Sequence, residues 1–144
     1  MKRLFFAALT LVLAACAPRL DSGPPTLNCD GERFGRLSRV PFTLSANITP
    51  QTNEVAGVLT EGGEKSFWVY GRRIADGPNF NLILSITDQT ESYIDLDLIL
   101  KKARLGYFSS SKSTLTGVLS GADFEGRQKA GVNNYVVTMA CQSG

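Results

Sequence analysis

Apolar and polar side chains alternate with a period of two through most of the chain after about residue 36. Residues 42–48 and 80–87 each place an apolar side chain at every second position, and residues 135–141 repeat the pattern up to Cys141. A period of two puts successive side chains on opposite faces of an extended backbone, so these segments are predicted as half-buried β-strands. No amphipathic helix of three turns is expected after the N-terminal segment.

Further strands are predicted where the alternation is shorter, at residues 54–60, 66–72, 93–100, 105–109 and 113–120. Glycines separate many of these segments, and we expect positive φ or a tight turn at Gly62, Gly63, Gly77, Gly121 and Gly126. Short strands joined by such turns predict an all-β domain, either a single antiparallel β-sandwich or a small meander barrel.

Residues 56–60 and 116–120 are similar in sequence, each with a Gly-Val-Leu core. Two explanations stay open: a duplicated half-barrel, or two strands with the same local requirements.

The N-terminal segment has a different pattern. Lys2 and Arg3 precede an apolar run over residues 4–13, and Ala14, Ala15 and Cys16 follow it directly. A run of about ten residues is too short for a spanning helix, which needs about 20. A basic start, a short apolar run and a small-residue junction are typical of a secretory signal peptide that is removed.

The residues Leu13-Ala14-Ala15-Cys16 resemble the lipobox of bacterial lipoproteins. The resemblance implies cleavage before Cys16, a diacylglyceryl group on its sulfur and an N-acyl chain such as palmitate on its new amino group. It also implies an exported protein anchored to the cell membrane, and Ala17 implies the outer membrane if the envelope is of the Gram-negative type. Ordinary signal cleavage without lipid is the alternative.

The expected organisation is a signal peptide over residues 1–15, a lipidated Cys16 with a disordered tether over residues 16–28, and one β domain over residues 29–144. The tether is expected because this stretch is rich in proline and has little to bury.

Charge and composition narrow the function classes. Lys and Arg number 15 and Asp and Glu 13, and removal of Lys2 and Arg3 with the signal leaves these charges balanced. Binding to nucleic acid is therefore not expected. Histidine is absent, which removes the commonest general base and transition-metal ligand, so neither an enzyme nor a metal site is expected.

Of the three cysteines, the lipid takes Cys16 and leaves Cys29 and Cys141 as a pair. In an exported protein an even pair predicts a disulfide, here one that joins the two ends of the folded part. Free or metal-binding thiols are the alternative.

Two groups of residues suggest chemistry, and each also has a simpler interpretation. Asp95 and Asp97 share one strand face and could hold calcium or act as the acid and base of a hydrolase. The simpler interpretation is that both carboxylates face solvent and bind no ligand. Ser109 and Lys112 have the Ser-x-x-Lys spacing of penicillin-recognising enzymes, but their serine-rich surroundings and the lack of companion motifs indicate a solvated loop.

The candidate surface binding site consists of Trp68, Tyr70, Arg72 and Arg73. Alternation puts Trp68 and Tyr70 on one face, where an exposed aromatic pair beside arginines could bind a glycan, a peptide or an anionic head group. The alternative is that both aromatic layers pack inside a sandwich or barrel.

Together these patterns predict a non-enzymatic, lipid-anchored envelope lipoprotein that binds or scaffolds at the membrane surface. A small barrel that carries an apolar ligand is the second hypothesis, and a hydrolase that uses carboxylates is the third. The expected partners are the membrane, through the anchor, and an envelope protein or glycan. No cofactor is expected apart from the covalent lipid on Cys16.

The cysteine assignment can be tested by thiol titration of the denatured mature protein. We expect no reactive thiol from Cys29 or Cys141 before reduction and two after it, because both are expected to be consumed in one bond. Two free thiols in the unreduced protein would contradict the disulfide.

Overall fold

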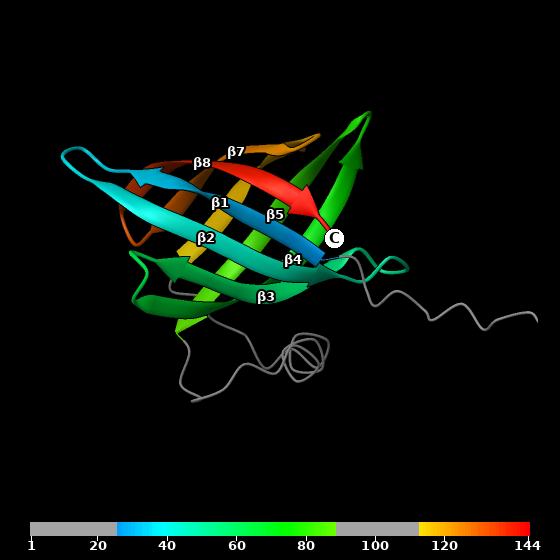
Figure 1. Cartoon of the computed structure of the whole chain (residues 1–144), viewed down its shortest axis with the longest axis horizontal. Helices are drawn as coiled ribbons and strands as arrows, with labels where there is room; N and C mark the ends of the chain where they lie inside the picture. The colour runs from blue at the N-terminus through cyan, green and yellow to red at the C-terminus, as the bar shows by residue number, and fades with distance from the viewer. Residues whose placement is uncertain (1–25, 89–112) are drawn as a thin grey trace, which may run out of the picture.

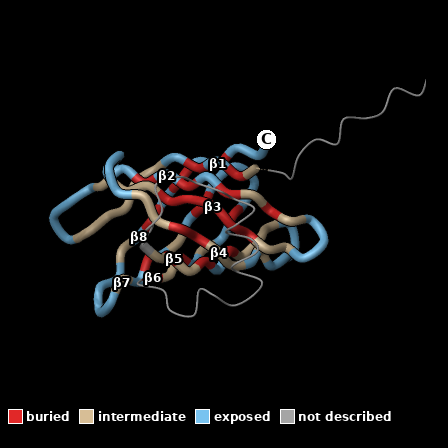
Figure 2. The backbone as a smooth tube through the Cα atoms, turned by 90° about the horizontal axis from the view of Figure 1, so that it is seen from below, coloured by how far each residue is buried: buried red, intermediate tan, exposed pale blue. Residues whose placement is uncertain are grey.

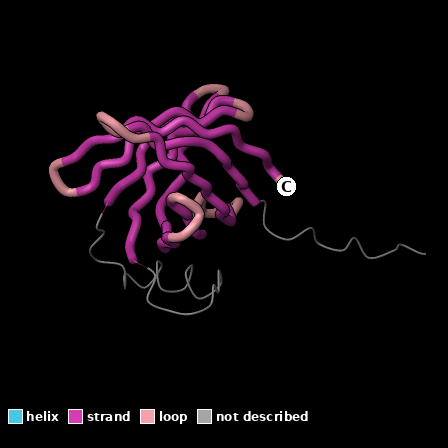
Figure 3. The backbone as a smooth tube through the Cα atoms, turned by 60° about the vertical axis from the view of Figure 1, so that its left-hand side comes forward, coloured by secondary structure: helices cyan, strands magenta, loops and turns pink. Residues whose placement is uncertain are grey.

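A computed structural model describes residues 26–88 and 113–144 of this chain. The described residues form strands joined by short turns, with no helix among them (Figure 3). In chain order the strands are β1 (Thr26–Phe34), β2 (Arg39–Ile48), β3 (Glu54–Glu61), β4 (Lys65–Asp76), β5 (Asn79–Asp88), β6 (Ser113–Ser120), β7 (Asp123–Ala130) and β8 (Asn133–Ser143).

The eight strands form one closed antiparallel barrel. Each strand pairs with the next along the chain, and β8 returns to pair with β1 (Figure 1). The prediction of an all-β antiparallel domain is confirmed, and of its two forms the barrel is the one observed. Closure leaves no unpaired strand edge in this sheet, so another chain cannot extend it by strand addition.

The barrel has two ends with different contents. The turns over residues 49–53, 77–78 and 121–122 lie at one end, together with Thr26 and the C-terminus. The turns over residues 35–38, 62–64 and 131–132 lie at the other end, where β5 finishes and β6 starts. We call these the terminal end and the hairpin end.

Apolar side chains fill the interior, because every second residue of each strand points inward. The buried band runs through the middle of the strands, with exposed turns at the ends (Figure 2). The largest fully buried side chains are Phe42, Phe124, Leu44, Leu59, Leu82, Leu84, Ile86, Leu115, Val55, Val69 and Val137. An eight-stranded barrel is just wide enough for side chains to occupy its interior.

Several inward positions are glycine because neighbouring strands approach closely there. A Cβ atom on Gly57 would meet the carbonyl oxygen of Ser45 and lie 2.5 Å from the Cα of Ala46. Gly117 and Gly126 are directly opposite each other, and the Phe124 ring occupies the space beside both. These glycines let the sheet curl tightly enough to close.

The strand predictions at residues 42–48, 54–60, 66–72, 80–87, 113–120 and 135–141 are confirmed, each within β2, β3, β4, β5, β6 or β8. Those at residues 93–100 and 105–109 lie outside the described residues. The expected turn glycines Gly62, Gly63, Gly77 and Gly121 all have positive φ.

Three features differ from expectation. β1 begins at Thr26, inside the stretch expected as tether, because Leu27 is buried in the barrel. β7 was not predicted, since its sequence is largely polar and only Phe124 is a large apolar residue. The prediction of a turn at Gly126 is wrong: this residue lies in β7 and faces inward, and the turn that follows uses Gly131.

The similar segments 56–60 and 116–120 belong to β3 and β6, which run in opposite directions around the barrel. If the barrel were two duplicated halves, equivalent strands would be four apart in chain order and would run in the same direction. The shared feature is instead an inward glycine that closely approaches a neighbouring strand, β2 for Gly57 and β7 for Gly117.

Replacing Gly57 by alanine is expected to lower the free energy of unfolding by about 3 kcal/mol, because the added methyl group collides with the backbone of β2. Gly121→Ala is the control: it has positive φ but nothing within 4 Å, and should cost only about 1 kcal/mol. Urea unfolding followed by circular dichroism measures both, and equal losses would contradict the close-approach explanation.

Candidate functional site

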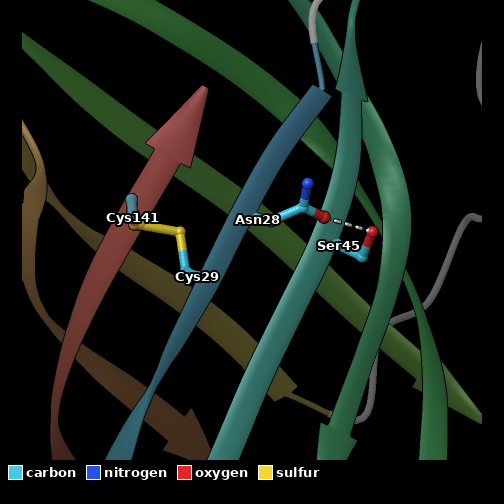
Figure 4. The surroundings of a disulfide bond; sticks show 4 residues. All are labelled: Asn28, Cys29, Ser45 and Cys141. Carbon is cyan, nitrogen blue, oxygen red and sulfur yellow. Dashed lines mark hydrogen bonds between the residues drawn. A yellow bond between two sulfur atoms is a disulfide. The ribbon is translucent and has the colours of Figure 1, made fainter. Parts of the chain in front are cut away.

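The disulfide between Cys29 and Cys141 joins the first and last strands of the barrel (Figure 4). The two residues are direct partners in the β1–β8 register, with Cα atoms 4.0 Å apart, and both side chains are buried. The predicted pairing is confirmed. On the other side of β1, the Ser45 hydroxyl of β2 donates a hydrogen bond of 2.8 Å to the Asn28 side-chain oxygen. β1 is therefore held by side chains on both flanks.

Trp68 and Tyr70 point to the outer face of the barrel, opposite to Val69, which belongs to the interior cluster. Trp68 is only 4% exposed, and its direct neighbour across the strand pair, Val58, is also buried. Tyr70 is partly buried opposite Ala56. Trp68 therefore does not present the free aromatic surface considered for this site.

The two arginines of the candidate site lie on opposite faces of β4. Arg72 points outward and is exposed, whereas Arg73 points inward at the terminal end of the barrel. The Arg73 guanidinium lies 4.3 Å from the centre of the Phe80 ring, and its Nε and Nη2 atoms donate to the Asn53 side-chain oxygen at 3.3 and 3.2 Å. The structure thus does not bring the four predicted residues into one patch.

A polar network occupies the interior at the hairpin end. Arg33 forms an ion pair with Glu61, with 2.7 Å between Nη1 and Oε1, and lies 4.5 Å from the centre of the Tyr135 ring. The Gln128 side chain bridges the network: its Oε1 accepts from Arg33 at 3.0 Å, and its Nε2 lies 3.3 Å from Glu61 and 3.2 Å from the Ser113 hydroxyl. The polar groups of this network form their hydrogen bonds with one another.

Sequence reasoning missed this network because its members come from β1, β3, β6 and β7, and Arg33 and Gln128 are 95 residues apart. The sequence contained one weak signal. Counting in steps of two along β7 from Phe124 places the polar Gln128 on the same inward face.

A shallow hollow of about 380 Å³ lies on the outer face, across β4, β5 and β6. Three half-exposed aliphatic residues line it: Ile74 at 46%, Ile83 at 51% and Val118 at 39% exposure. One row of directly paired residues crosses this hollow from β4 to β7, in the order Arg72, Ile83, Thr116 and Arg127. The hollow is therefore an apolar surface between two arginines. One of them, Arg72, belongs to the predicted binding site.

Within residues 26–88 and 113–144, no group of three or more His, Cys, Asp or Glu side chains could hold a metal ion. No helix in that part of the chain is long and apolar enough to cross a membrane. Cys16, Asp95, Asp97, Ser109 and Lys112 lie outside the described residues.

Comparison with known proteins found no matching family model, no matching curated protein and no matching solved structure.

Trp68→Ala is expected to lower the free energy of unfolding by about 3–5 kcal/mol, because a nearly fully buried indole is removed. Ile83→Ala, a half-exposed residue on the same face, is the control and should cost no more than about 1 kcal/mol. Since Trp68 is the only tryptophan, unfolding should be followed by circular dichroism rather than by fluorescence. If Trp68→Ala lowered the free energy of unfolding only slightly, the burial of Trp68 would be contradicted and the residue would again be a candidate for surface binding.

Proposed function

We propose that this protein is a lipid-anchored envelope lipoprotein whose barrel domain binds or scaffolds at the membrane surface without catalysing a reaction. The observation that carries the proposal is the lipobox-like sequence Leu13-Ala14-Ala15-Cys16, which ends ten residues before the first strand of the barrel at Thr26. Two or three acyl chains on Cys16 would hold the domain at a membrane almost permanently, since each buried methylene contributes about 0.8 kcal/mol.

The filled interior favours a role for the outer surface over the carriage of an apolar ligand. A carrier needs an enclosed cavity, and small-molecule sites usually have about 300 Å³ or more. Here the inward positions carry large side chains such as Phe42, Phe124 and Leu84, which are fully buried against one another.

A non-enzymatic role is favoured by the chemistry of the polar groups. The chain has no histidine, and the inward-facing Arg33 and Glu61 neutralise each other instead of facing a cleft. The apolar hollow around Ile83, with Arg72 and Arg127 beside it, offers a surface suited to an envelope protein or a glycan.

The anchoring proposal is tested by the intact mass of protein purified from membranes of the expressing cell. We expect a chain that starts at Cys16 and carries two or three acyl chains, because the lipobox directs cleavage and lipidation there. Cys16→Ser is the matched control: it keeps the barrel residues and should lack the added lipid mass. An unlipidated wild-type chain would overturn the proposed anchor.

A further inference from the structure

Two aliphatic side chains are almost fully exposed at the hairpin end of the barrel. Leu37, in the turn between β1 and β2, is 101% exposed, and Val132, in the turn between β7 and β8, is 94% exposed. Figure 1 shows the β1–β2 hairpin reaching beyond the body of the barrel, away from the C-terminus, and Figure 2 shows the turns as exposed. Neither side chain contributes to the core that stabilises the fold.

The two turns are neighbours because β1 pairs with β8. Phe34 lies directly opposite both Arg39 in β2 and Val136 in β8, and Val136 is 48% exposed. Phe34, Val132 and Val136 line one hollow, Leu37 follows its lining residue Arg36 in the chain, and we call these four apolar residues the hairpin tips. A hollow of about 720 Å³ lies between the two turns, lined by Phe34, Gly35, Arg36, Val132, Asn133, Asn134, Tyr135 and Val136.

A cation lies beside each of the two turns. Arg36 is adjacent to Leu37 in the chain and exposed, and Lys129 is exposed near the end of β7. Neither has an ion pair within the described part of the chain, whose ion pairs join Arg33 to Glu61 and Arg39 to Glu32. Arg39 also lies 5.3 Å from the centre of the Phe34 ring, and its contact with Glu32 is long, at 3.8 Å.

We infer that the hairpin tips dock on an anionic phospholipid surface. Leu37 and Val132 would enter the interfacial region of the bilayer, while Arg36 and Lys129 lie at the level of the phosphate groups. Exposed apolar side chains next to cations are suited to binding at a membrane interface, where both burial and charge contribute. The Asn133 and Asn134 amides at the hollow between the turns can donate hydrogen bonds to phosphate oxygens.

The length of the chain before β1 is compatible with this contact. This inference rests on the proposed anchor at Cys16, from which residues 17–25 lead to Thr26. Nine residues reach roughly 28 Å when extended at about 3.1 Å per residue. Leu37 lies eleven residues beyond Thr26, which is roughly 36 Å along the strand but only roughly 28 Å along the barrel axis, because barrel strands tilt by about 40°. The same bilayer can therefore hold the lipid on Cys16 and contact the hairpin tips.

The inference is tested by placing an environment-sensitive thiol-reactive fluorophore at Leu37→Cys in the full chain, purified from membranes and reconstituted in vesicles of phosphatidylcholine and phosphatidylglycerol in equal parts. Gln51→Cys, exposed in the turn between β2 and β3 at the terminal end, is the matched control. Both sites lie in exposed turns, so the barrel is expected to fold in each variant, and circular dichroism checks that it does.

We expect emission from position 37 to move to shorter wavelength and to be quenched by lipid-borne quenchers, while position 51 shows neither effect. The shift should decrease in vesicles of phosphatidylcholine alone, because the lipid then has no net negative charge. It should also decrease in an Arg36→Gln background, because the protein then lacks a cation at the level of the phosphates. Position 37 behaving like position 51 in both lipid mixtures overturns the inference and leaves the hairpin tips to a protein partner.

The intact mass of the same labelled samples separates this inference from the proposed anchor. Acylated protein with a solvent-like signal at position 37 retains the anchor and rejects docking of the tips. Unacylated protein rejects the anchor, and the tips are then judged by whether that protein still co-sediments with the anionic vesicles and shows the shift. Failure to co-sediment rejects both.

Discussion

The pairing of β8 with β1 is the contact on which the rest of this structure depends. Seven of the eight strand pairs join consecutive strands, and six of these seven need only turns of two to five residues. The β1–β8 pair brings together the two ends of the folded chain, so it carries the largest loss of chain entropy. The disulfide between Cys29 and Cys141 lies within this pair and spans 112 residues. In chain-entropy models a disulfide that closes a loop of about 100 residues stabilises the folded state by about 4.7 kcal/mol.

Closure in turn decides where the protein can interact. The inward positions of the barrel include large apolar residues such as Phe42 and Phe124 and glycines such as Gly57, where strands meet closely. Among residues 26–88 and 113–144, the charged inward residues lie toward the ends, where Arg73 contacts Phe80 and Asn53 and where Arg33 pairs with Glu61. The filled interior and the closed sheet favour the proposal that binding occurs on the outer face and at the turns.

The two ends of the barrel offer different surfaces. The terminal end carries both the first strand's start and the C-terminus, so a lipid on Cys16 would act from there. The hairpin end carries Leu37 and Val132, exposed beside Arg36. A domain held near a membrane by a short chain meets that membrane repeatedly, because tethering raises the effective concentration of the surface. With the proposed anchor in place, weak contacts at the turns would then be sufficient to orient the barrel.

Local sequence patterns determined much of the fold. The period of two located β2, β3, β4, β5, β6 and β8, the paired cysteines predicted the disulfide, and Gly62, Gly63, Gly77 and Gly121 marked turns, because strand alternation and positive φ are local requirements. Only the tertiary structure decided between sandwich and barrel, since this depends on whether β8 meets β1. It also decided that Trp68 is buried, that Arg72 and Arg73 separate, and that Gln128 joins Arg33 to Ser113. These outcomes rest on contacts between residues far apart in the chain, whose neighbours exist only once the sheet has curled and closed.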